Sequence, residues 1–397
     1  MDKLFEVFTR LLNAVNTDFK RYLIDEIDWS NRMIVVTGPR GCGKTTMLLQ
    51  YIKTNFEIDQ SILYVSLDDI YFTENKLIDL ADSFIKNGGK FLFIDEIHKY
   101  PNWSIELKNI YDNYIDLKII VTGSSILNIY KGFADLSRRA VQYSLPGLSF
   151  REFLNLNSKY KFQRYSLQEI LKKHIQISMD ITQNLKIIPE FKNYLQYGYY
   201  PYFIENKNSY QQKLSNTINT VLESDMLSVN SIEYKNVINL KKLLYVIAQS
   251  VPFKANVTKL SERIGISRNT LVLYLDYLNK AQLITNLYSP NKGYGILTKP
   301  EKLYLNNPNI IFAIAQENAN IGNVRETFFL NQMSSNHKIN ISDSSDFLID
   351  NKYTFEVGGK NKTAQQIKNI KNSYLAIDEI ETGYMNKIPL WLFGFMY

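Results

Sequence analysis

Short apolar runs alternate with segments of helical spacing along the first part of the chain. The apolar runs predict five buried strands, at residues 33–37, 62–67, 91–95, 118–122 and 141–145. Strands that alternate with helices are typical of an α/β fold in which helices cover a parallel sheet. Ligands of such sheets bind at the carboxyl ends of the strands. We therefore expect functional residues directly after the strands.

After residue 150 the pattern becomes mostly helical, with a break at Gly198-Tyr199-Tyr200-Pro201. We interpret this region as a helical lid over the ligand site. At 397 residues the chain exceeds the usual size of one domain. The predicted domains are an α/β core, a helical lid, a winged helix-turn-helix and a C-terminal α/β domain, at residues 1–150, 151–235, 236–305 and 306–397.

Two helices joined by a tight turn are predicted in the third of these domains. Their spacing places them at Val257–Ile264 and Arg268–Lys280, with the turn at Gly265-Ile266. The segment from Thr285 to Leu305 can form a hairpin. Two such helices followed by a hairpin predict a winged helix-turn-helix.

The first predicted strand leads into a segment with the pattern of a phosphate-binding loop. The pattern requires Gly, four free positions, then Gly-Lys-Ser/Thr. It is met by Gly38-Pro39-Arg40-Gly41-Cys42-Gly43-Lys44-Thr45, with Thr46 in the helix that follows. Glycines let backbone N–H groups approach phosphate oxygens, and the helix N-terminus adds partial positive charge. We expect Lys44 to reach the β- and γ-phosphates of ATP and the Thr45 hydroxyl to bind Mg²⁺.

A pair of carboxylates ends the third predicted strand. Asp95 and Glu96 follow the apolar run 91–94 in the form of a Walker B element. We expect Asp95 to hold Mg²⁺ and Glu96 to orient or deprotonate the attacking water, because hydrolysis needs one carboxylate for the metal and another for the water. The fourth strand ends in small polar residues, with Thr122 the preferred sensor of the γ-phosphate and Ser124 the alternative.

The composition is that of a globular protein, with 45% hydrophobic and 21% charged residues. The single cysteine, Cys42, lies in the phosphate loop, so no disulfide can form within the chain and a cytoplasmic location is expected. No apolar run approaches the roughly 18 residues that span a bilayer. The N-terminus lacks the pattern of a signal sequence, and we expect no membrane partner. The three histidines are too far apart for zinc-site spacing.

Positive charge is concentrated in the third predicted domain. Residues 236–300 contain nine Lys or Arg side chains against Glu262 and Asp276, a net charge of +7 that equals that of the whole chain. A basic segment indicates a nucleic-acid partner, and we expect double-stranded DNA. The candidate contacts, on the second helix and its N-cap, are Ser267, Arg268, Asn269, Thr270 and Lys280. A domain that serves only for packing, or that binds a protein partner, is the alternative.

With these motifs in place, the chain resembles the bacterial and archaeal ATPases of the AAA superfamily that pair an AAA-14 domain with a C-terminal DUF4143 region. The segments that carry the resemblance are Asp95–Trp103, Thr122–Ser125, Ser137–Arg139, Leu145–Phe153, Gly198–Pro201 and Lys302–Pro308. The resemblance implies a P-loop NTPase that forms a homo-oligomer, in which an arginine of one subunit meets the γ-phosphate bound by the next. Arg138 and Arg139 are both candidates for this catalytic arginine.

The resemblance also implies a restriction-endonuclease-like α/β fold for the C-terminal domain. Such PD-(D/E)xK sites need an Asp and a Glu on one metal and a Lys two residues after the Glu. Asp346 and Glu356 fit this pattern, and Glu326 fits an upstream helical acid. Gly358 stands where the Lys is needed, and Lys360 lies two positions later. We therefore expect a nuclease-like fold without nuclease activity. An ATP-gated nuclease and a slow, protein-binding NTPase switch are the alternative functions.

Overall fold

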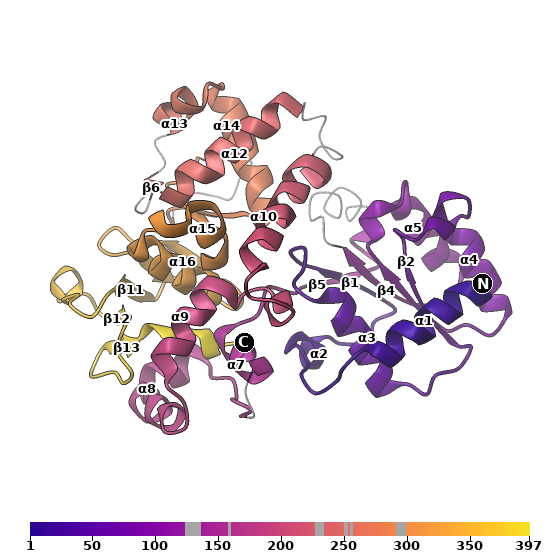
Figure 1. The fold of residues 1–397 in the computed structure, drawn as a ribbon, viewed down its shortest axis with the longest axis horizontal. Helices are drawn as coiled ribbons and strands as arrows, with labels where there is room; N and C mark the ends of the chain where they lie inside the picture. The colour runs from indigo at the N-terminus through magenta and orange to yellow at the C-terminus, as the bar shows by residue number, and fades with distance from the viewer. Residues whose placement is uncertain (124–135, 158–159, 227–233, 250–252, 255–256, 291–298) are drawn as a thin grey trace. The chain divides into compact units, whose positions relative to one another are not determined.

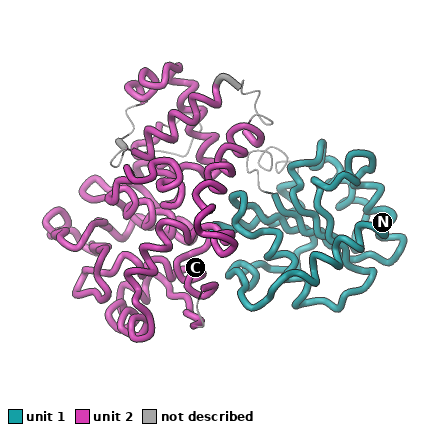
Figure 2. Tube along the Cα trace, viewed as in Figure 1, with its two compact units in different colours: residues 1–147 teal, residues 148–397 magenta. Residues whose placement is uncertain are grey.

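The structure is a computed structural model, and it describes residues 1–123, 136–157, 160–226, 234–249, 253–254, 257–290 and 299–397. Contacts divide the chain into two compact units, residues 1–147 and residues 148–397 (Figure 2). The division of the second unit into a lid, a winged helix and a C-terminal domain is finer than this and stays a prediction.

A five-stranded parallel sheet forms the centre of the first unit (Figure 1). Its strands are β1 (Met33–Thr37), β2 (Ile62–Ser66), β3 (Phe91–Asp95), β4 (Lys118–Gly123) and β5 (Val141–Ser144). The strand order is β2-β3-β4-β1-β5, and every pairing is parallel. The predicted parallel α/β sheet is confirmed. In it, β4 lies between the strand that precedes the phosphate loop and the strand that ends at Asp95.

Helices cover both faces of this sheet. They are α1 (Asp2–Ala14), α2 (Leu23–Glu26), α3 (Lys44–Asn55), α4 (Leu77–Lys86) and α5 (Trp103–Asn113), with 3-10 turns η1 (Ile70–Thr73) and η2 (Ile97–Lys99). On one face, alternate strand residues such as Val35 and Ile94 pack with apolar side chains of α4 and α5. On the other face, Tyr51 of α3 lies against Phe93, with ring centroids 6.4 Å apart. Burial on both faces explains why β1 to β4 are mostly apolar, whereas β5 at the edge of the sheet is only partly buried.

The second unit begins with helices, as the pattern after residue 150 predicts. They are α7 (Phe150–Asn157), α8 (Leu167–Thr182), α9 (Ile187–Tyr197) and α10 (Tyr210–Thr220), with a 3-10 turn η3 (Pro201–Ile204) and a π-helical turn η4 (Val221–Asp225). A capping box starts α8: the Ser166 hydroxyl accepts the N–H of Glu169, whose carboxylate accepts the N–H of Ser166. These two hydrogen bonds determine where the helix begins.

Three helices and a small antiparallel sheet follow. They are α12 (Tyr234–Gln249), β6 (Phe253–Lys254), α13 (Val257–Ile264), α14 (Arg268–Lys280), β7 (Ile284–Leu287) and β8 (Lys302–Leu305), with strand order β6-β8-β7. Both α13 and α14 have the predicted bounds. Gly265 between them has a φ of 80°, a left-handed conformation that glycine adopts readily. Strands β7 and β8 pair antiparallel, as a hairpin requires, and residues 291–298 between them lie outside the described part of the chain.

A mixed sheet occupies the C-terminal part of the second unit. Its strands are β9 (Ile339–Ile341), β10 (Phe347–Ile349), β11 (Tyr353–Gly358), β12 (Ser373–Ile377) and β13 (Lys387–Pro389). The order is β13-β12-β11-β10-β9, antiparallel from β9 to β11 and parallel from β11 to β13. The accompanying helices are α15 (Pro308–Ala315) and α16 (Ile321–Met333), with 3-10 turns η5 (Gln316–Asn318), η6 (Gln365–Ile367) and η7 (Leu390–Phe395). Phe329 of α16 packs on Phe355 of β11 at 5.0 Å.

The early helices of the second unit share a core with this C-terminal part. The Asn309 side chain accepts hydrogen bonds from the backbone N–H of Tyr199, at 2.8 Å, and from the Tyr210 hydroxyl. Phe328 of α16 packs edge-on against Phe191 of α9 at 4.7 Å. Residues of the expected lid and of the expected C-terminal domain therefore pack together within one unit.

Candidate nucleotide-binding site

The phosphate loop connects β1 to α3 and takes a backbone path that only glycine fits. Gly41 and Gly43 have φ angles of 81° and 95°, which strain residues with a side chain. At Gly38, a Cβ atom would lie 2.2 Å from the carbonyl oxygen of Leu145. Gly43 directly precedes α3, so the first N–H groups of that helix point at the loop interior. This cradle fits a polyphosphate.

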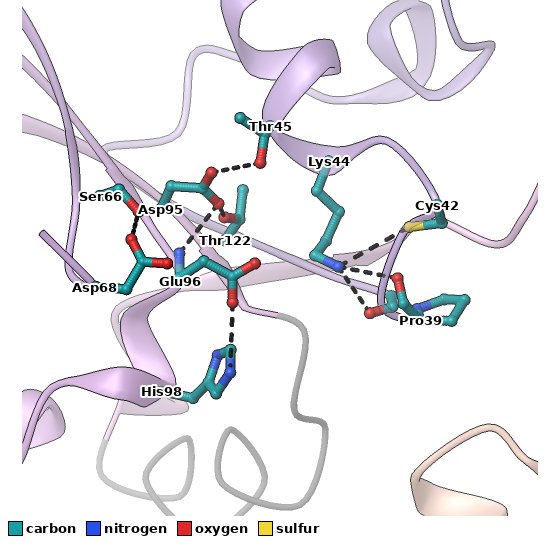
Figure 3. Close-up of polar contacts among 11 residues, drawn as sticks. Pro39, Cys42, Lys44, Thr45, Ser66, Asp68, Asp95, Glu96, His98 and Thr122 are labelled. Carbon is teal, nitrogen blue, oxygen red and sulfur yellow. Dashed lines mark hydrogen bonds and ion pairs between the residues drawn. The ribbon is translucent and has the colours of Figure 1, made fainter. Parts of the chain in front are cut away.

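Lys44 lies at the start of α3 and is 5% exposed. Its Nζ donates to the carbonyl oxygens of Gly38 at 2.9 Å and Pro39 at 3.1 Å, and lies 3.9 Å from the Cys42 Sγ (Figure 3). A buried ammonium held by carbonyls of the phosphate loop is placed to exchange them for phosphate oxygens. Cys42 is fully buried, which accords with a packing role. The other two predicted loop residues, Arg40 and Thr46, are half-buried and exposed.

The Asp95 carboxylate collects hydrogen bonds from several elements (Figure 3). Its Oδ2 accepts from the Thr45 hydroxyl of α3 at 2.5 Å and from the Tyr64 hydroxyl of β2 at 2.8 Å. Its Oδ1 accepts from the Thr122 hydroxyl of β4 and from the Glu96 N–H at 3.0 Å. The structure thus brings Thr45, Asp95 and Thr122 together. Ser124, the alternative to Thr122, lies outside the described residues.

Tyr64 is a member of this site that the sequence interpretation missed. It is a phenol between the apolar residues Leu63 and Val65 of β2 and is 4% exposed. Burial, and next the Asp95 charge, raise the pKa of Tyr64 above its ordinary value, so its hydroxyl stays a donor. A buried tyrosine needs a polar partner for its hydroxyl. A tyrosine in a buried strand next to the Walker B strand was therefore the sequence feature from which this contact could have been predicted.

Oxygen atoms make up the donor set at this site. The Thr45 hydroxyl and the Asp95 carboxylate are ligands of the kind that Mg²⁺ prefers. Among the described residues, no group of three or more His, Cys, Asp or Glu side chains is arranged to hold a metal ion. Mg²⁺ keeps several waters and is commonly bound by one or two protein groups plus phosphates. The residues present fit a nucleotide-bound Mg²⁺.

Glu96 lies beside Asp95 and faces a buried histidine. Its backbone has a φ of 52°, and its Oε2 lies 3.4 Å from the Nε2 of His98, whose side chain is 2% exposed. Burial chiefly, followed by the positive charges of Lys99, Lys44 and Arg40, lowers the pKa of His98 to about 3. The imidazole beside Glu96 is therefore neutral near pH 7.

The two candidate arginines differ in their surroundings. Arg139 forms a two-pronged ion pair with Asp112, with Nε–Oδ1 and Nη2–Oδ2 distances of 2.8 and 2.9 Å. Arg138 is exposed. A bidentate pair holds a guanidinium in one orientation, so Arg138 is the side chain that can reach a neighbouring molecule without breaking such a pair.

The predicted DNA contacts lie at both ends of α14. Ser267 and Thr270 bond to each other: the Ser267 Oγ accepts the Thr270 N–H at 3.1 Å, and their hydroxyl oxygens are 2.7 Å apart. Arg268 and Asn269 are exposed next to them. Lys280 pairs with Asp276 at 2.9 Å, which neutralises its charge. The start of α14 therefore offers a stronger cationic surface than its end.

A second cluster of acids lies in the C-terminal part, where α16, β8 and β11 meet. Glu326 is 8% exposed and accepts the Tyr304 O–H at 2.6 Å. Asp346 accepts the N–H of Val357 at 2.9 Å. Glu356 is 3% exposed and accepts the O–H of Ser345 at 2.8 Å. Three predicted acids thus lie in one region of the fold.

Two lysines lie against the acids of this cluster. Lys362, rather than Lys360, forms the ion pair with Glu356. Gly358 makes the approach possible, because a Cβ atom there would lie 2.6 Å from the Lys362 Cγ. A second lysine, Lys302, lies 3.8 Å from Asp346. A loop thus returns Lys362, a lysine more distant in the sequence, to the place that Gly358 leaves open.

Burial makes the charged forms of these acids costly. The pKa of Glu326 is raised to about 7, first by burial and then by the Asp346 charge. Burial, followed by the Glu356 charge, also raises the pKa of Asp346. The cluster therefore holds more negative charge than its surroundings favour, which is common at functional sites.

Comparisons with known proteins agree with the geometry of the first unit. Residues 30–154 match the family model described as an AAA domain, AAA_14. With the parallel sheet and the phosphate loop, this match defines a nucleotide-binding domain of the P-loop NTPase class. Residues 188–320 match a domain of unknown function, DUF8612. The DUF4143 assignment expected for the C-terminal region was therefore wrong. Among the described residues, no helix is both long and apolar enough to cross a membrane.

Two curated relatives are uncharacterized proteins. One, from Methanocaldococcus jannaschii, is 28% identical over 73% of this chain, and the match spans 64% of the relative's length. The other, from Haemophilus influenzae, is 22% identical over 86% of this chain and 87% of the relative. Among solved structures, the Walker-type ATPase of Pyrococcus abyssi is 12% identical with a TM-score of 0.42, over 75% of this chain and 95% of that chain.

The raised pKa of Glu326 predicts a pH-dependent stability. The folded chain holds this proton more tightly than the unfolded chain, whose value is 4.5. The stabilisation is therefore fully present below pH 4.5 and is lost as the pH rises through about 7. Glu326→Gln keeps an acceptor for Tyr304 and removes the charge. We expect its stability relative to the unsubstituted chain to be greater at pH 8 than at pH 5, by about 2 kcal/mol in urea unfolding.

The matched control is Glu317→Gln, which removes the charge of an exposed glutamate. Its stability difference should be the same at both pH values. An equal effect of Glu326→Gln at pH 5 and pH 8 would contradict the raised pKa.

Proposed function

We propose that the first unit hydrolyses ATP with Mg²⁺ and that the nucleotide state controls DNA binding by the second unit. The observation that carries the proposal is the meeting of Thr45, Thr122 and Asp95 within hydrogen-bonding distance, with Glu96 adjacent. In this proposal Asp95 holds the metal and Glu96 activates the water, since hydrolysis needs one carboxylate for each. The AAA domain match over residues 30–154 supports the same assignment.

The phosphate loop, Gly38–Thr46, binds and orients the triphosphate. In this proposal Lys44 releases the carbonyl oxygens of Gly38 and Pro39 and donates to phosphate oxygens instead. The buried ammonium thereby keeps acceptors for its hydrogen bonds. Thr45 and Asp95 would hold Mg²⁺. When bound, the ion would neutralise the charge that develops on the transferred phosphoryl group.

Glu96 accepts the proton of the attacking water. Its carboxylate is next to the neutral imidazole of His98, which can donate a hydrogen bond and hold the side chain in one orientation. Thr122 donates its hydroxyl to the Oδ1 of Asp95. It is placed to sense the γ-phosphate, because a hydroxyl can turn from the carboxylate to a phosphate oxygen.

The catalytic arginine comes from a neighbouring subunit of a homo-oligomer in this proposal. Arg138 is preferred over Arg139 because Arg138 is exposed and Arg139 is paired with Asp112. A guanidinium supplied by another subunit stabilises the charge of the transferring phosphoryl group.

The DNA contact in this proposal is the start of α14. Arg268 and Asn269 are exposed there, next to the Ser267 and Thr270 hydroxyls. Residues of this kind at the N-terminal end of a helix suit phosphate and base-edge contacts. The γ-phosphate is present in one nucleotide state and absent in the other, which is the differential contact that a nucleotide-controlled change requires.

The catalytic assignment predicts that Glu96→Gln keeps nucleotide binding and loses hydrolysis. An amide cannot take the proton of water, so kcat should fall by about 10²–10⁴-fold. Affinity for a fluorescent ATP analogue should change by less than about twofold, because Glu96 does not hold phosphate.

The matched control is Glu57→Gln, an exposed glutamate of the same unit, which should hydrolyse ATP normally. Normal hydrolysis by Glu96→Gln would show that the catalytic assignment is wrong.

The DNA assignment predicts an ATPase that double-stranded DNA stimulates, with the stimulation fading as salt rises. Arg268→Ala should reduce the slope of log affinity against log salt concentration by about 1. The measurement is a fluorescence titration of labelled duplex at several salt concentrations, paired with ATP turnover.

Lys192→Ala is the control, since it removes the same charge from an exposed position on α9. Turnover that DNA leaves unchanged at every salt concentration would instead favour a slow NTPase switch with a protein partner.

A second candidate function, cleavage of nucleic acid at the acid cluster, is favoured by one observation. Lys362 reaches Glu356 through the space above Gly358, and so supplies the lysine that the linear motif lacks. Asp346 and Glu356 would then share a metal, with Lys362 placed to stabilise developing charge.

Cleavage of linear duplex in Mg²⁺ or Mn²⁺ tests this candidate. If it is right, Glu356→Gln and Lys362→Met should each lose at least about 10²-fold in rate. Lys360→Met should cut normally, because the ion pair to Glu356 belongs to Lys362. Absence of cutting in both metals would remove the candidate.

A further inference from the structure

A buried arginine, Arg21, joins the phosphate loop to the last residues of the first unit. Arg21 precedes β1 and is 4% exposed. Its Nη1 donates to the Cys42 carbonyl oxygen at 2.5 Å. Its Nη2 donates to the carbonyl oxygens of Pro146 at 2.8 Å and Gly147 at 2.9 Å. One guanidinium thus contacts two segments that are about a hundred residues apart in the chain.

The segment after β5 also touches the other end of the phosphate loop. The Leu145 N–H donates to the Thr37 carbonyl at 2.7 Å. The Leu145 carbonyl lies so close to Gly38 that a Cβ atom there would be 2.2 Å away. Residues 145–147 therefore contact the start of the phosphate loop directly, through Leu145, and its middle through Arg21.

The same segment leads directly into the second unit. That unit begins at Leu148, whose N–H donates to the Tyr199 carbonyl at 2.7 Å. Tyr199 belongs to the break between α9 and η3 and is 2% exposed. Motion of Pro146 and Gly147 would therefore act on a residue that is tied into the core of the second unit.

The chemistry of the guanidinium suits a rigid connection. Its donors form a planar fork with fixed directions, whereas a lysine ammonium is a single point with rotating donors. Nη1 binds the Cys42 carbonyl, and Nη2 binds the carbonyls of Pro146 and Gly147. These carbonyls cannot move apart without breaking a hydrogen bond to the buried guanidinium, which is costly. A displacement of Cys42 on nucleotide binding would therefore be passed to Pro146 and Gly147.

We propose that Arg21 is a positioning residue that couples occupancy of the phosphate loop to the connection between the two units. The inference rests on nucleotide binding as proposed above. It identifies the side chain that transmits a change of nucleotide state to the end of the first unit. It assigns no contact between Arg21 and the nucleotide.

Hydrogen exchange of the full chain, read by mass spectrometry with and without ADP and Mg²⁺, tests the coupling. In the unsubstituted chain, nucleotide should slow exchange of peptides that cover residues 38–46 and residues 144–150, each by about fivefold or more. In Arg21→Met, nucleotide should still slow exchange in residues 38–46. The effect on residues 144–150 should shrink to less than about twofold.

Arg21→Lys serves as the second variant because it keeps the buried charge and lacks the fork. It should bind nucleotide, and its protection of residues 144–150 should also fall. Arg10→Met is the matched control, since Arg10 is an exposed arginine of α1, and it should behave as the unsubstituted chain.

Each outcome separates this inference from the proposed function. Equal protection of residues 144–150 in the unsubstituted chain and both variants would overturn the coupling. Loss of nucleotide binding in a folded Arg21→Lys chain would also overturn it, in favour of a role in holding the loop alone. Failure of the unsubstituted chain to bind any nucleotide would reject the proposed function itself.

Discussion

Hydrogen bonds from four separate segments converge on the carboxylate of Asp95, and the arrangement of the first unit depends on them. Thr45 comes from α3, Tyr64 from β2, Thr122 from β4, and the Glu96 N–H from the turn after β3. The strand order makes this possible, because β4 lies between β1 and β3 and β2 lies on the far side of β3. A buried carboxylate is stable only when its oxygens are satisfied, so the site and the sheet stabilise each other.

Buried charge is treated differently in the two units. In the first unit, Lys44 and Arg21 are held by carbonyl oxygens and Asp95 by hydroxyls and an N–H, so each charge has neutral partners. In the second unit, acids lie near other acids, and burial first, then the Asp346 charge, raises the pKa of Glu326. Lys302 and Lys362 offset part of that repulsion. The first arrangement suits a site that receives an anion, whereas the second makes the charged form of Glu326 costly.

Much of the fold and part of the candidate site could be predicted from local sequence. The phosphate loop depends on two glycines with positive φ, Gly41 and Gly43, and on the lysine that follows them, which spacing reveals. Helices α13 and α14 were predicted with their observed bounds, because Gly265 and Ser267 mark a turn and a cap that neighbouring residues alone determine. Tyr64 and Lys362 could not be predicted in this way. Tyr64 meets Asp95 across 31 positions, and Lys362 reaches Glu356 only because a loop folds back over Gly358.

By itself the sequence determined the parallel α/β core, the phosphate loop and the carboxylate pair, because each is encoded by periodicity or by residues adjacent in the chain. Only the tertiary structure decided which arginine is paired and which is exposed, which lysine neutralises Glu356, and which side chains surround Asp95. It also placed Arg21 between Cys42 and Gly147. These contacts depend on the strand order and on loops that fold back toward the sheets. Both bring distant residues within hydrogen-bonding distance, and no local pattern specifies either.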